Sequence, residues 1–431
     1  MNETERINEE PQIHVGVMTR PEITVCFTGT YIGPDGLSAD GEQTLRRSAD
    51  GVEYRGTLYP EALFTPEAGP ESSFELRGVT IGIGFHWQRA ENQRFAGALR
   101  VIPSSDDPSG IIAVNEIGLE EYLKSVISSE MSADASDALL RAHAVVSRSW
   151  LMRQLLDRGK HSSAEQGGWR TARLADGEEV EELCKWYDRE DHSQFDVCAD
   201  DHCQRYQGVT RQTNPRVAAA IEATRGEMLT FGGEICDARF SKCCGGVSER
   251  FENCWEDAPK AYLEHVADTS AEGGEPLCDT RDPAIIAQVL NDYDRESLDF
   301  FRWQARYSAD ELGRLVAKRS GMDLGTIEAL EPLERTPAGR ITRLLIRGSR
   351  RTAVVGKELE IRRWLSESHL RSSAFTVSRE ANGSSYVLDG RGWGHGVGMC
   401  QIGAAVMGAR GYGYREILKH YFPKAGIEKI Y

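Results

Sequence analysis

The chain has few cysteines for its length, no long apolar run and a shortage of basic residues. It carries 10 cysteines in 431 residues, too few for a small scaffold held together by disulfides. No stretch reaches the ~18 consecutive apolar residues of a membrane-spanning helix, so we expect no integral membrane segment. The 51 basic and 67 acidic residues give a net charge of −16, which makes nucleic acid and anionic membrane surfaces unfavourable partners.

The first residues lack the pattern of a secretory signal. The stretch Met1-Asn-Glu-Thr-Glu-Arg6 is polar and acid-rich, whereas a signal peptide has a basic start and an apolar region of roughly 7–15 residues. No signal peptide is visible, and the sequence leaves open whether the protein stays inside or has lost a leader. The localisation therefore stays unassigned.

The remaining composition is that of a globular protein. Hydrophobic residues make up 40% and charged residues 27%, which excludes a disordered chain, a collagen-like repeat and a coiled coil. No internal repeat is visible. Short β-like segments separated by Gly, Pro and Asp turns run from Gln12 to about Leu99. Helical and strand-like segments then follow in separate groups, and this segregation predicts the α+β class.

Several elements can be placed by periodicity and capping. Apolar residues at helical spacing predict a helix from Leu119 to about residues 128–131, and Ser136 is a good N-cap for a second helix. Residues 157–182 are polar and resemble an insertion. A hairpin is expected over residues 340–355, and a final helix near Tyr414.

Glu130 stands in the short motif Ser128-Ser-Glu-Met131, at the predicted junction of two helices. A carboxyl held near apolar neighbours has a raised pKa, as a general acid requires. The alternative interpretation is a solvated Glu with no chemical role, which is the commoner case at such junctions.

A Cys/His loop is the second candidate. His192, Cys198, His202 and Cys203 fall within twelve residues, and zinc takes four nitrogen or sulfur ligands in a tetrahedron. Four protein ligands would close the shell, so such a zinc would be structural. A surface loop with free thiols is the alternative, Cys184 is a substitute ligand, and a Cys198–Cys203 disulfide would be the leading replacement.

Two glycine-containing loops follow. Residues 240–249 contain Lys242 and a Gly pair, and residues 390–403 contain six glycines together with Trp393 and His395. Glycines permit close backbone approach to a ligand, Trp393 offers a stacking platform for a sugar ring, and we expect residues 394–403 to line a cleft. The sequence is not a P-loop. The alternatives are a tight turn for the first loop and a buried structural loop for the second.

Together these motifs resemble the SpoIID/LytB family of stage II sporulation protein D-like proteins. The resemblance rests on five segments in order, from about residue 95 to the C-terminus. They are residues 113–131, residues 142–150, the Cys/His loop with Ala223-Thr-Arg-Gly-Glu-Met-Leu-Thr230, the 240–246 loop, and Gly394-His-Gly-Val-Gly-Met-Cys-Gln-Ile-Gly-Ala404. It implies the first part of a SpoIID-like core over residues 95–282, an α/β subregion over 283–372 and the closing part of the core over 373–431. Residues 1–94 lie outside the resemblance, and their pattern predicts a β-rich N-terminal region.

The resemblance implies work on peptidoglycan. Members of the sporulation branch are lytic transglycosylases that cut the MurNAc-β-1,4-GlcNAc bond of denuded glycan strands and leave a 1,6-anhydro product. By position, Glu130 matches the catalytic glutamate and Arg148 and Lys242 match basic residues near the substrate. Trp393, His395 and Gln401 are the further substrate-binding candidates, and the Cys/His loop is similar to the zinc loop of some members. One carboxyl serves as acid and then base, so no cofactor is needed for catalysis.

A second interpretation comes from the other branch of the family. LytB-type members are amidase enhancers, so this chain would be a non-catalytic wall-binding activator with a cell-wall N-acetylmuramoyl-L-alanine amidase as its partner. A zinc hydrolase built on the Cys/His loop is disfavoured, because all four side chains would be ligands and no position would remain for water.

Overall fold

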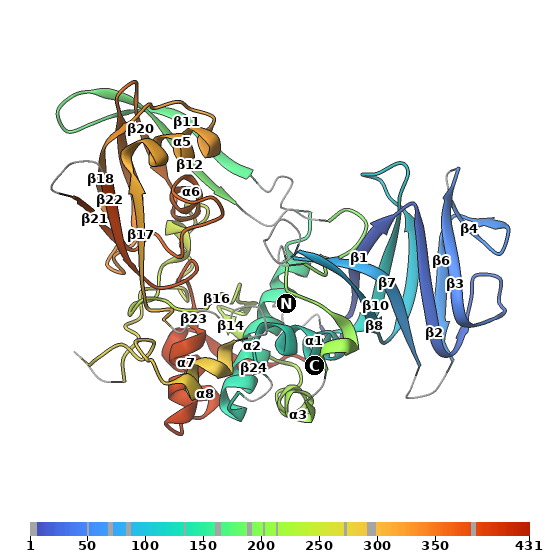
Figure 1. The fold of residues 1–431 in the computed structure, drawn as a ribbon. Helices are drawn as coiled ribbons and strands as arrows, with labels where there is room; N and C mark the ends of the chain where they lie inside the picture. Colours follow the sequence, from blue (N-terminus) through green and yellow to red (C-terminus); the bar gives the residue numbers. More distant parts are fainter. Residues whose placement is uncertain are drawn as a thin grey trace.

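The computed structural model describes most of the chain. The described ranges are 7–49, 51–67, 72–82, 88–132, 135–159, 165–187, 192–200, 203–212, 214–270, 274–290, 299–380 and 385–431. Figure 1 shows three parts: an N-terminal sheet, a helical centre and a second β-rich lobe. No helix among these ranges is both long and apolar enough to cross a lipid bilayer.

The N-terminal part is a sheet that, within the described ranges, has eleven strands in the order β13-β1-β10-β9-β6-β2-β3-β4-β5, with β7 pairing β2 and β8. Buried and more exposed residues alternate along its strands, as in β2, where Ile23, Val25 and Phe27 are buried and the residues between them are more exposed. The strands are β1 (Gln12–Arg20), β2 (Glu22–Ile32), β3 (Ser38–Ser48), β4 (Gly51–Tyr54), β5 (Thr57–Tyr59), β6 (Ala62–Pro66), β7 (Ser73–Ile81), β8 (Arg89–Phe95), β9 (Ala98–Pro103), β10 (Ile111–Gly118) and β13 (Val197–Cys198). The pairing of β9 and β10 carries this sheet beyond residue 94, to Gly118.

The helical centre packs against that sheet through one continuous apolar core. Its helices are α1 (Leu119–Glu130), α2 (Asp137–Leu156), α3 (Pro215–Ala223), α7 (Gln401–Ala409) and α8 (Tyr414–Tyr421). Ser136 caps α2, since its side chain accepts a hydrogen bond from the Leu139 N–H at 3.3 Å. The two consecutive helices and the last helix predicted from the sequence are confirmed, and α7 is an additional helix that begins inside the glycine-rich segment.

The second lobe has a core of its own, centred on the buried side chain of Trp364. It holds the sheet β11-β12-β20-β19-β18 and the sheet β17-β22-β21. Their bounds are β11 (Glu165–Arg173), β12 (Glu179–Tyr187), β17 (Arg302–Ser308), β18 (Ile327–Arg335), β19 (Ile341–Gly348), β20 (Thr352–Gly356), β21 (Phe375–Arg379) and β22 (Ser385–Arg391), with helices α5 (Ala309–Ser320) and α6 (Glu358–Trp364). The predicted hairpin over residues 340–355 is β19 and β20. Much of the polar stretch 157–182, which resembles an insertion in the sequence, belongs to the β11–β12 hairpin. The second strand of this hairpin pairs in parallel with β20.

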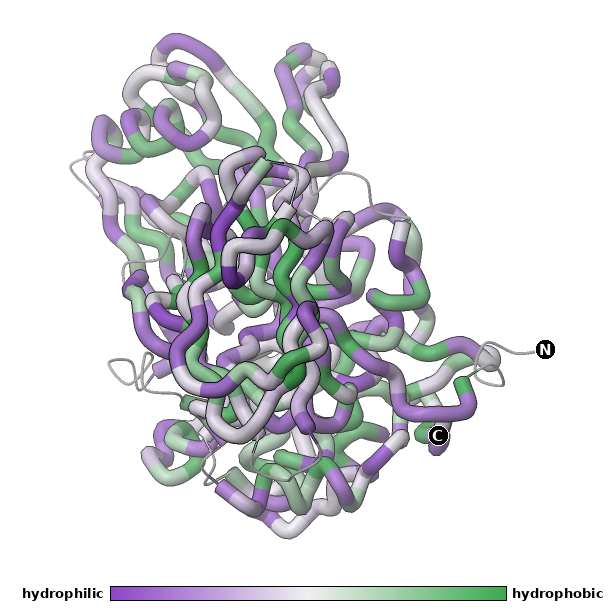
Figure 2. Tube along the Cα trace, turned by 90° about the vertical axis from the view of Figure 1, so that its right-hand side faces the viewer, coloured by the Kyte–Doolittle hydropathy of each residue, from purple (hydrophilic) through white to green (hydrophobic). Residues whose placement is uncertain are grey.

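Short elements connect the parts. They are β14 (Glu227–Phe231), β15 (Glu234–Ile235), β16 (Phe240–Ser241), β23 (Met399–Cys400), β24 (Gly426–Lys429), α4 (Pro283–Ile286) and the 3₁₀ turns Gly208–Arg211, Phe251–Asn253 and Ala287–Val289. Figure 2 shows that hydrophobic and hydrophilic stretches alternate along the chain, with hydrophilic ones at many of the outer turns. The mixed sheets and separate helices confirm the predicted α+β class and the β-rich N-terminal region.

Candidate functional site

Glu130 is the last residue of α1 and is half-buried. The helix ends there because Met131 turns into extended backbone, while its N–H still bonds the Ile127 carbonyl at 3.1 Å. Met131 is buried, so it anchors the chain directly after the carboxylate. The helix and the buried methionine together fix where the Glu130 side chain starts.

A short segment from elsewhere in the chain borders this junction. The Ser132 N–H bonds the Gln288 carbonyl at 3.1 Å, and the Ser136 N–H bonds the Gln288 side-chain oxygen at 2.9 Å. The next residue, Val289, accepts a hydrogen bond from the Lys242 ammonium at 2.5 Å. Lys242 therefore reaches the same short segment that holds the Glu130–Ser136 loop.

His143 of α2 lies near Lys242 and contacts Gln401. Its side chain is fully buried, its Nε2 lies 3.1 Å from the Gln401 amide nitrogen, and its Nδ1 lies 3.1 Å from the Ser147 hydroxyl. The Gln401 amide donates to Nε2, so the ring proton is on Nδ1 and is donated to Ser147. Burial and then the charge of Lys242 lower the pKa of His143 to about 3. The ring is neutral at pH 7 and orients Gln401 at the start of α7.

The glycine-rich segment is bound to the 240–244 loop along its length. Strands β16 and β23 pair in parallel, and Trp393 exchanges two backbone hydrogen bonds with Cys243. The half-buried Trp393 ring lies 4.8 Å from Phe300 and 4.8 Å from the Arg371 guanidinium. The structure thus brings Lys242, Trp393 and Gln401 onto two adjacent segments beside the α1–α2 junction.

His395 faces the protein in this structure. Its Nδ1 accepts a hydrogen bond from the Val397 N–H at 3.0 Å, and its ring meets the edge of Trp255 at 4.9 Å. Burial and then the positive charges of Arg239 and Arg340 lower the pKa of His395 well below its usual value. The ring is therefore neutral and held by the protein.

The glycines of this segment also make room for protein groups. A Cβ at Gly396 would lie 2.4 Å from the Arg340 guanidinium, and one at Gly398 would lie 2.1 Å from the Arg239 carbonyl oxygen. Both glycines have positive φ angles, 78° and 74°, which side chains disfavour. Close packing and the positive φ angles are enough to explain why glycine stands at these two positions, without a bound ligand.

Arg148 lies away from Glu130. Its side chain is 0% exposed and forms a two-pronged ion pair with Glu120, at 3.0 and 2.6 Å, and a hydrogen bond to the Glu227 carbonyl at 2.9 Å. Glu120 stands at the opposite end of α1 from Glu130, about 15 Å along the axis for ten residues. Arg148, predicted from the sequence to lie near the substrate, has a guanidinium that is enclosed by protein groups.

The Cys/His loop is partly assembled. The ligand atoms of His192, Cys198 and Cys203 all lie within 4.8 Å of one another, with Cys203 Sγ 3.4 Å from His192 Nε2. His202, the fourth predicted ligand, lies outside the described residues. Two thiols and an imidazole at this spacing fit the donor set that zinc prefers. Burial and then Cys203 and Cys198 raise the pKa of Tyr122 in α1, so the Cys/His loop lies near this helix.

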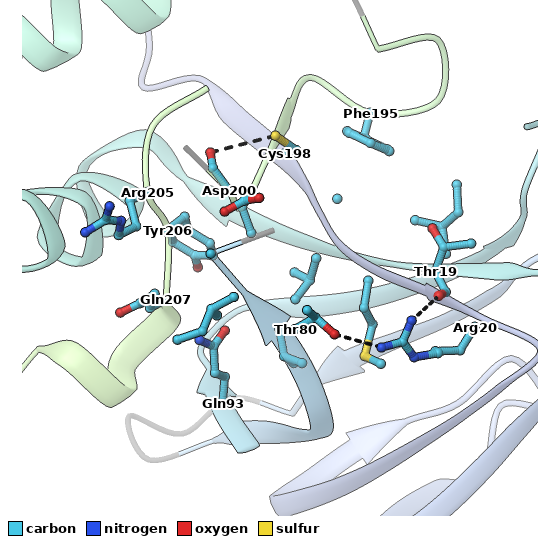
Figure 3. Close-up of a pocket in the computed structure, with 18 of the residues that line it drawn as sticks. Thr19, Arg20, Thr80, Gln93, Phe195, Cys198, Asp200, Arg205, Tyr206 and Gln207 are labelled. Atoms are coloured by element: carbon cyan, nitrogen blue, oxygen red, sulfur yellow. Dashed lines mark hydrogen bonds between the residues drawn. The ribbon is translucent and has the colours of Figure 1, made fainter. Parts of the chain in front are cut away.

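A pocket of about 500 Å³ opens between the N-terminal sheet and this loop (Figure 3). Its wall includes Arg20 of β1, Gln93 of β8, Arg205 and Tyr206, and it reaches His192 and Cys198. Among the described residues that line it, none is Glu130, Lys242 or another predicted substrate-binding residue. The pocket therefore belongs to the surroundings of the Cys/His loop.

Two features were missed by reasoning from the sequence. His143 stands within the segment 142–150 that carried the family resemblance, and its fixed spacing from Ser147, one helical turn, was the available signal. The Gln288–Val289 contact gave no signal, because it joins the α1–α2 junction to a segment more than 150 residues later.

Comparison with known proteins supports the resemblance. Residues 107–231 match the family described as "Stage II sporulation protein", and residues 249–398 match a "Domain of unknown function (DUF8618)". The chain is 28% identical over 329 residues to an uncharacterized protein of Brachyspira hyodysenteriae, covering 76% of this chain and 70% of that protein. It is 26% identical over 320 residues to "Stage II sporulation protein D" of Bacillus amyloliquefaciens, covering 74% and 76% of the two chains.

A further relative is the "Amidase enhancer" of Bacillus subtilis, which is 24% identical over 250 residues, or 51% of this chain and 33% of that protein. The matched region 107–231 contains α1, Glu130, α2 and the Cys/His loop. The matched region and these relatives on both branches show that this chain is similar to members of the SpoIID/LytB family.

Proposed function

We propose that the protein is a peptidoglycan lytic transglycosylase in which Glu130 acts as acid and then as base. The observation that carries the proposal is the position of Glu130. It ends α1 within the family-matched region and is half-buried, and the residues that follow it bond the Gln288 segment that Lys242 also reaches.

The reaction needs one carboxyl group. Glu130 donates its proton to the oxygen of the MurNAc–GlcNAc bond as the C1–O bond breaks, which frees the 4-hydroxyl of GlcNAc. The 6-hydroxyl of the same MurNAc then attacks C1 and gives its proton to the Glu130 carboxylate. The product has a 1,6-anhydro ring, no water is consumed, and the carboxyl regains its starting state. Because water is not the nucleophile, the spacing rule for the two carboxylates of hydrolases does not apply.

Other residues on the two neighbouring segments are proposed to hold the glycan. Gln401 is buried and hydrogen-bonded to neutral His143, so it is proposed to position the start of α7. Lys242 offers a positive charge, and the half-buried Trp393 ring offers an apolar face to a sugar. Arg148 and His395 are proposed not to touch glycan, since both are held by protein groups: Arg148 anchors the start of α1 through Glu120, and His395 anchors the glycine-rich segment.

Zinc bound by the Cys/His loop is proposed to be structural. His192, Cys198 and Cys203 would hold it with His202, and a closed ligand set would brace the loop that packs near α1. No step of the reaction passes through it.

The test is cleavage of denuded glycan strands by the full chain and by Glu130→Gln. This change keeps the shape of the side chain and removes its proton, so the rate should fall by at least about two decades, the scale of general acid catalysis. Glu121→Gln, on the same helix, is the matched control and should keep near-normal activity. A Glu130→Gln variant with near-normal cleavage would contradict the proposal.

The second candidate function is suggested by the relative named "Amidase enhancer". In that case the chain binds wall material and stimulates an amidase without cutting glycan. The same assay separates the two: wild-type protein would leave the strands intact, and addition of a cell-wall N-acetylmuramoyl-L-alanine amidase would show faster release of peptide in its presence.

A further inference from the structure

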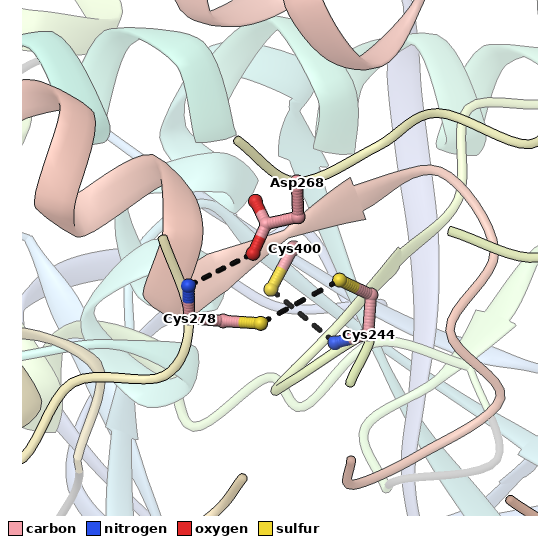
Figure 4. A group of neighbouring side chains, drawn as sticks. All are labelled: Cys244, Asp268, Cys278 and Cys400. Carbon is pink, nitrogen blue, oxygen red and sulfur yellow. Dashed lines mark hydrogen bonds between the residues drawn. The ribbon is translucent and has the colours of Figure 1, made fainter. Parts of the chain in front are cut away.

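A group of three cysteines and one aspartate lies buried next to the segments of Lys242 and Gln401. Figure 4 shows Cys244, Asp268, Cys278 and Cys400 pointing toward one another. All four are at most 1% exposed, and one ligand atom from each lies within 4.8 Å of the others. They come from three parts of the chain that only the fold brings together. The group is separate from the Cys/His loop, with which it shares no residue.

The spacing of the sulfur atoms fits a metal centre. The Sγ atoms of Cys244 and Cys278 are 3.7 Å apart. Zinc–sulfur bonds of about 2.3 Å in a tetrahedron put neighbouring sulfurs about 3.8 Å apart. A disulfide would require a sulfur–sulfur distance of about 2.05 Å. The arrangement therefore already has the edge length of a tetrahedral zinc–thiolate site.

The carboxylate and one thiol are held by outer partners, as metal ligands commonly are. Asp268 Oδ1 accepts a hydrogen bond from the Tyr421 hydroxyl at 2.6 Å, and Oδ2 accepts one from the Cys278 N–H at 2.8 Å. The Cys244 N–H points at Cys400 Sγ, 3.3 Å away. These contacts hold the side chains of the group in place, so that a metal ion could bind with little rearrangement of its ligands.

The donor set also suits a cation. Three thiolates and a carboxylate buried together need a compensating positive charge. A divalent ion would supply that charge, and its binding would release the ligand protons.

We propose that Cys244, Asp268, Cys278 and Cys400 bind one Zn²⁺ ion in a closed, structural site. Three thiolates and one carboxylate are a donor set that borderline-soft zinc accepts, and four protein ligands leave no position for a reacting water. The site fastens the residue before Gln401 to the loop after Lys242. It therefore holds the two segments of the candidate site in register, whatever reaction that site performs.

Cys243 is a neighbour rather than a proposed ligand. It is buried, and its thiol interacts with those of Cys278 and Cys400. It is the residue best placed to replace a missing ligand. The test must therefore not depend on one cysteine variant.

The first measurement is zinc content per chain after purification without chelator. Cys278→Ser should lose one equivalent relative to the wild type. Cys236→Ser is the matched control, because Cys236 is equally buried but is not one of the four proposed ligands, and it should lose none. Equal zinc in the wild type and a folded Cys278→Ser chain, with Cys243 also replaced by Ser, would overturn the proposal.

The second measurement avoids any change in the buried group. In Cys198→Ser, which disables the Cys/His loop, one equivalent of zinc should remain, and X-ray absorption should show three sulfur neighbours at about 2.3 Å. A folded Cys198→Ser chain without zinc, or a Cys244–Cys278 disulfide found by mass spectrometry of the unreduced protein, would overturn the proposal.

Discussion

The structure and the sequence assign different roles to Arg148: an ion pair that stabilises the fold, and a contact with substrate. Its guanidinium supplies two of the four donors that surround the Glu120 carboxylate, and the others are the Gly226 N–H at 3.1 Å and the Tyr431 hydroxyl at 2.7 Å. Arg148→Met removes the charge and leaves the Glu120 carboxylate buried with half of its donors. Breaking a buried ion pair on one side costs about 3–5 kcal/mol, and the two remaining donors favour the lower end of that range.

The expected loss of about 3 kcal/mol is large enough to measure. At about 2–4 °C per kcal/mol, the melting transition of the body formed by the N-terminal sheet and the helices should fall by about 6–12 °C. The double variant Arg148→Met/Glu120→Leu should lose less than the sum of the single variants, by about 1–3 kcal/mol, because it leaves no unpaired charge.

The control is Arg46→Met, which removes an exposed ion pair with Glu22; the two side chains are 61% and 49% exposed. It should cost less than about 1 kcal/mol. Urea unfolding and glycan binding would be measured on each variant. An Arg148→Met protein that is as stable as the wild type but no longer binds glycan would refute the reasoning and return Arg148 to the substrate-binding role predicted from the sequence.

Three further predictions concern His143, Cys198 and Gly396. An unfolded histidine binds a proton below about pH 6.5, whereas folded His143 does so only near 3, so the free energy of unfolding should fall as pH drops through this window, by about 1.4 kcal/mol per unit. Urea unfolding at several pH values should show a shallower slope for His143→Gln, and an unchanged slope would argue against this assignment. Cys198→Ser should lower both zinc content and melting temperature, with activity falling only as far as folding does; a full complement of zinc would show that Cys198 is not a ligand. Gly396→Val should unfold the protein, because its side chain would meet the Arg340 guanidinium; a folded variant with lost glycan binding would instead support the cleft lining predicted from the sequence.

Local signals explain what was predictable. The cap at Ser136 and the apolar spacing after Leu119 depend on neighbouring residues only, so both helices could be placed in advance. The family motifs also pointed to Glu130, Lys242 and Gln401, whose roles stay predictions. The fold places the segments of Lys242 and Gln401 side by side, since the Ile402 N–H bonds the Lys242 carbonyl and β16 pairs with β23.

Non-local pairing explains what was not predictable. Nothing in residues 165–187 shows that Glu181–Cys184 pair in parallel with Ala353–Gly356. Helical periodicity gives the direction of Arg148 on its helix but not the carboxylate that it meets. The buried cysteine cluster is hidden for the same reason, since its members are up to 156 residues apart in the chain.

The most direct test of the central proposal is the mass of the product released from denuded glycan strands by the wild-type chain. The account predicts fragments that end in 1,6-anhydro-MurNAc, lighter by one water than hydrolysis products, and their absence with Glu130→Gln. Fragments with reducing ends would mean hydrolysis, and intact strands would mean that the chain does not cut glycan; either result would contradict the account.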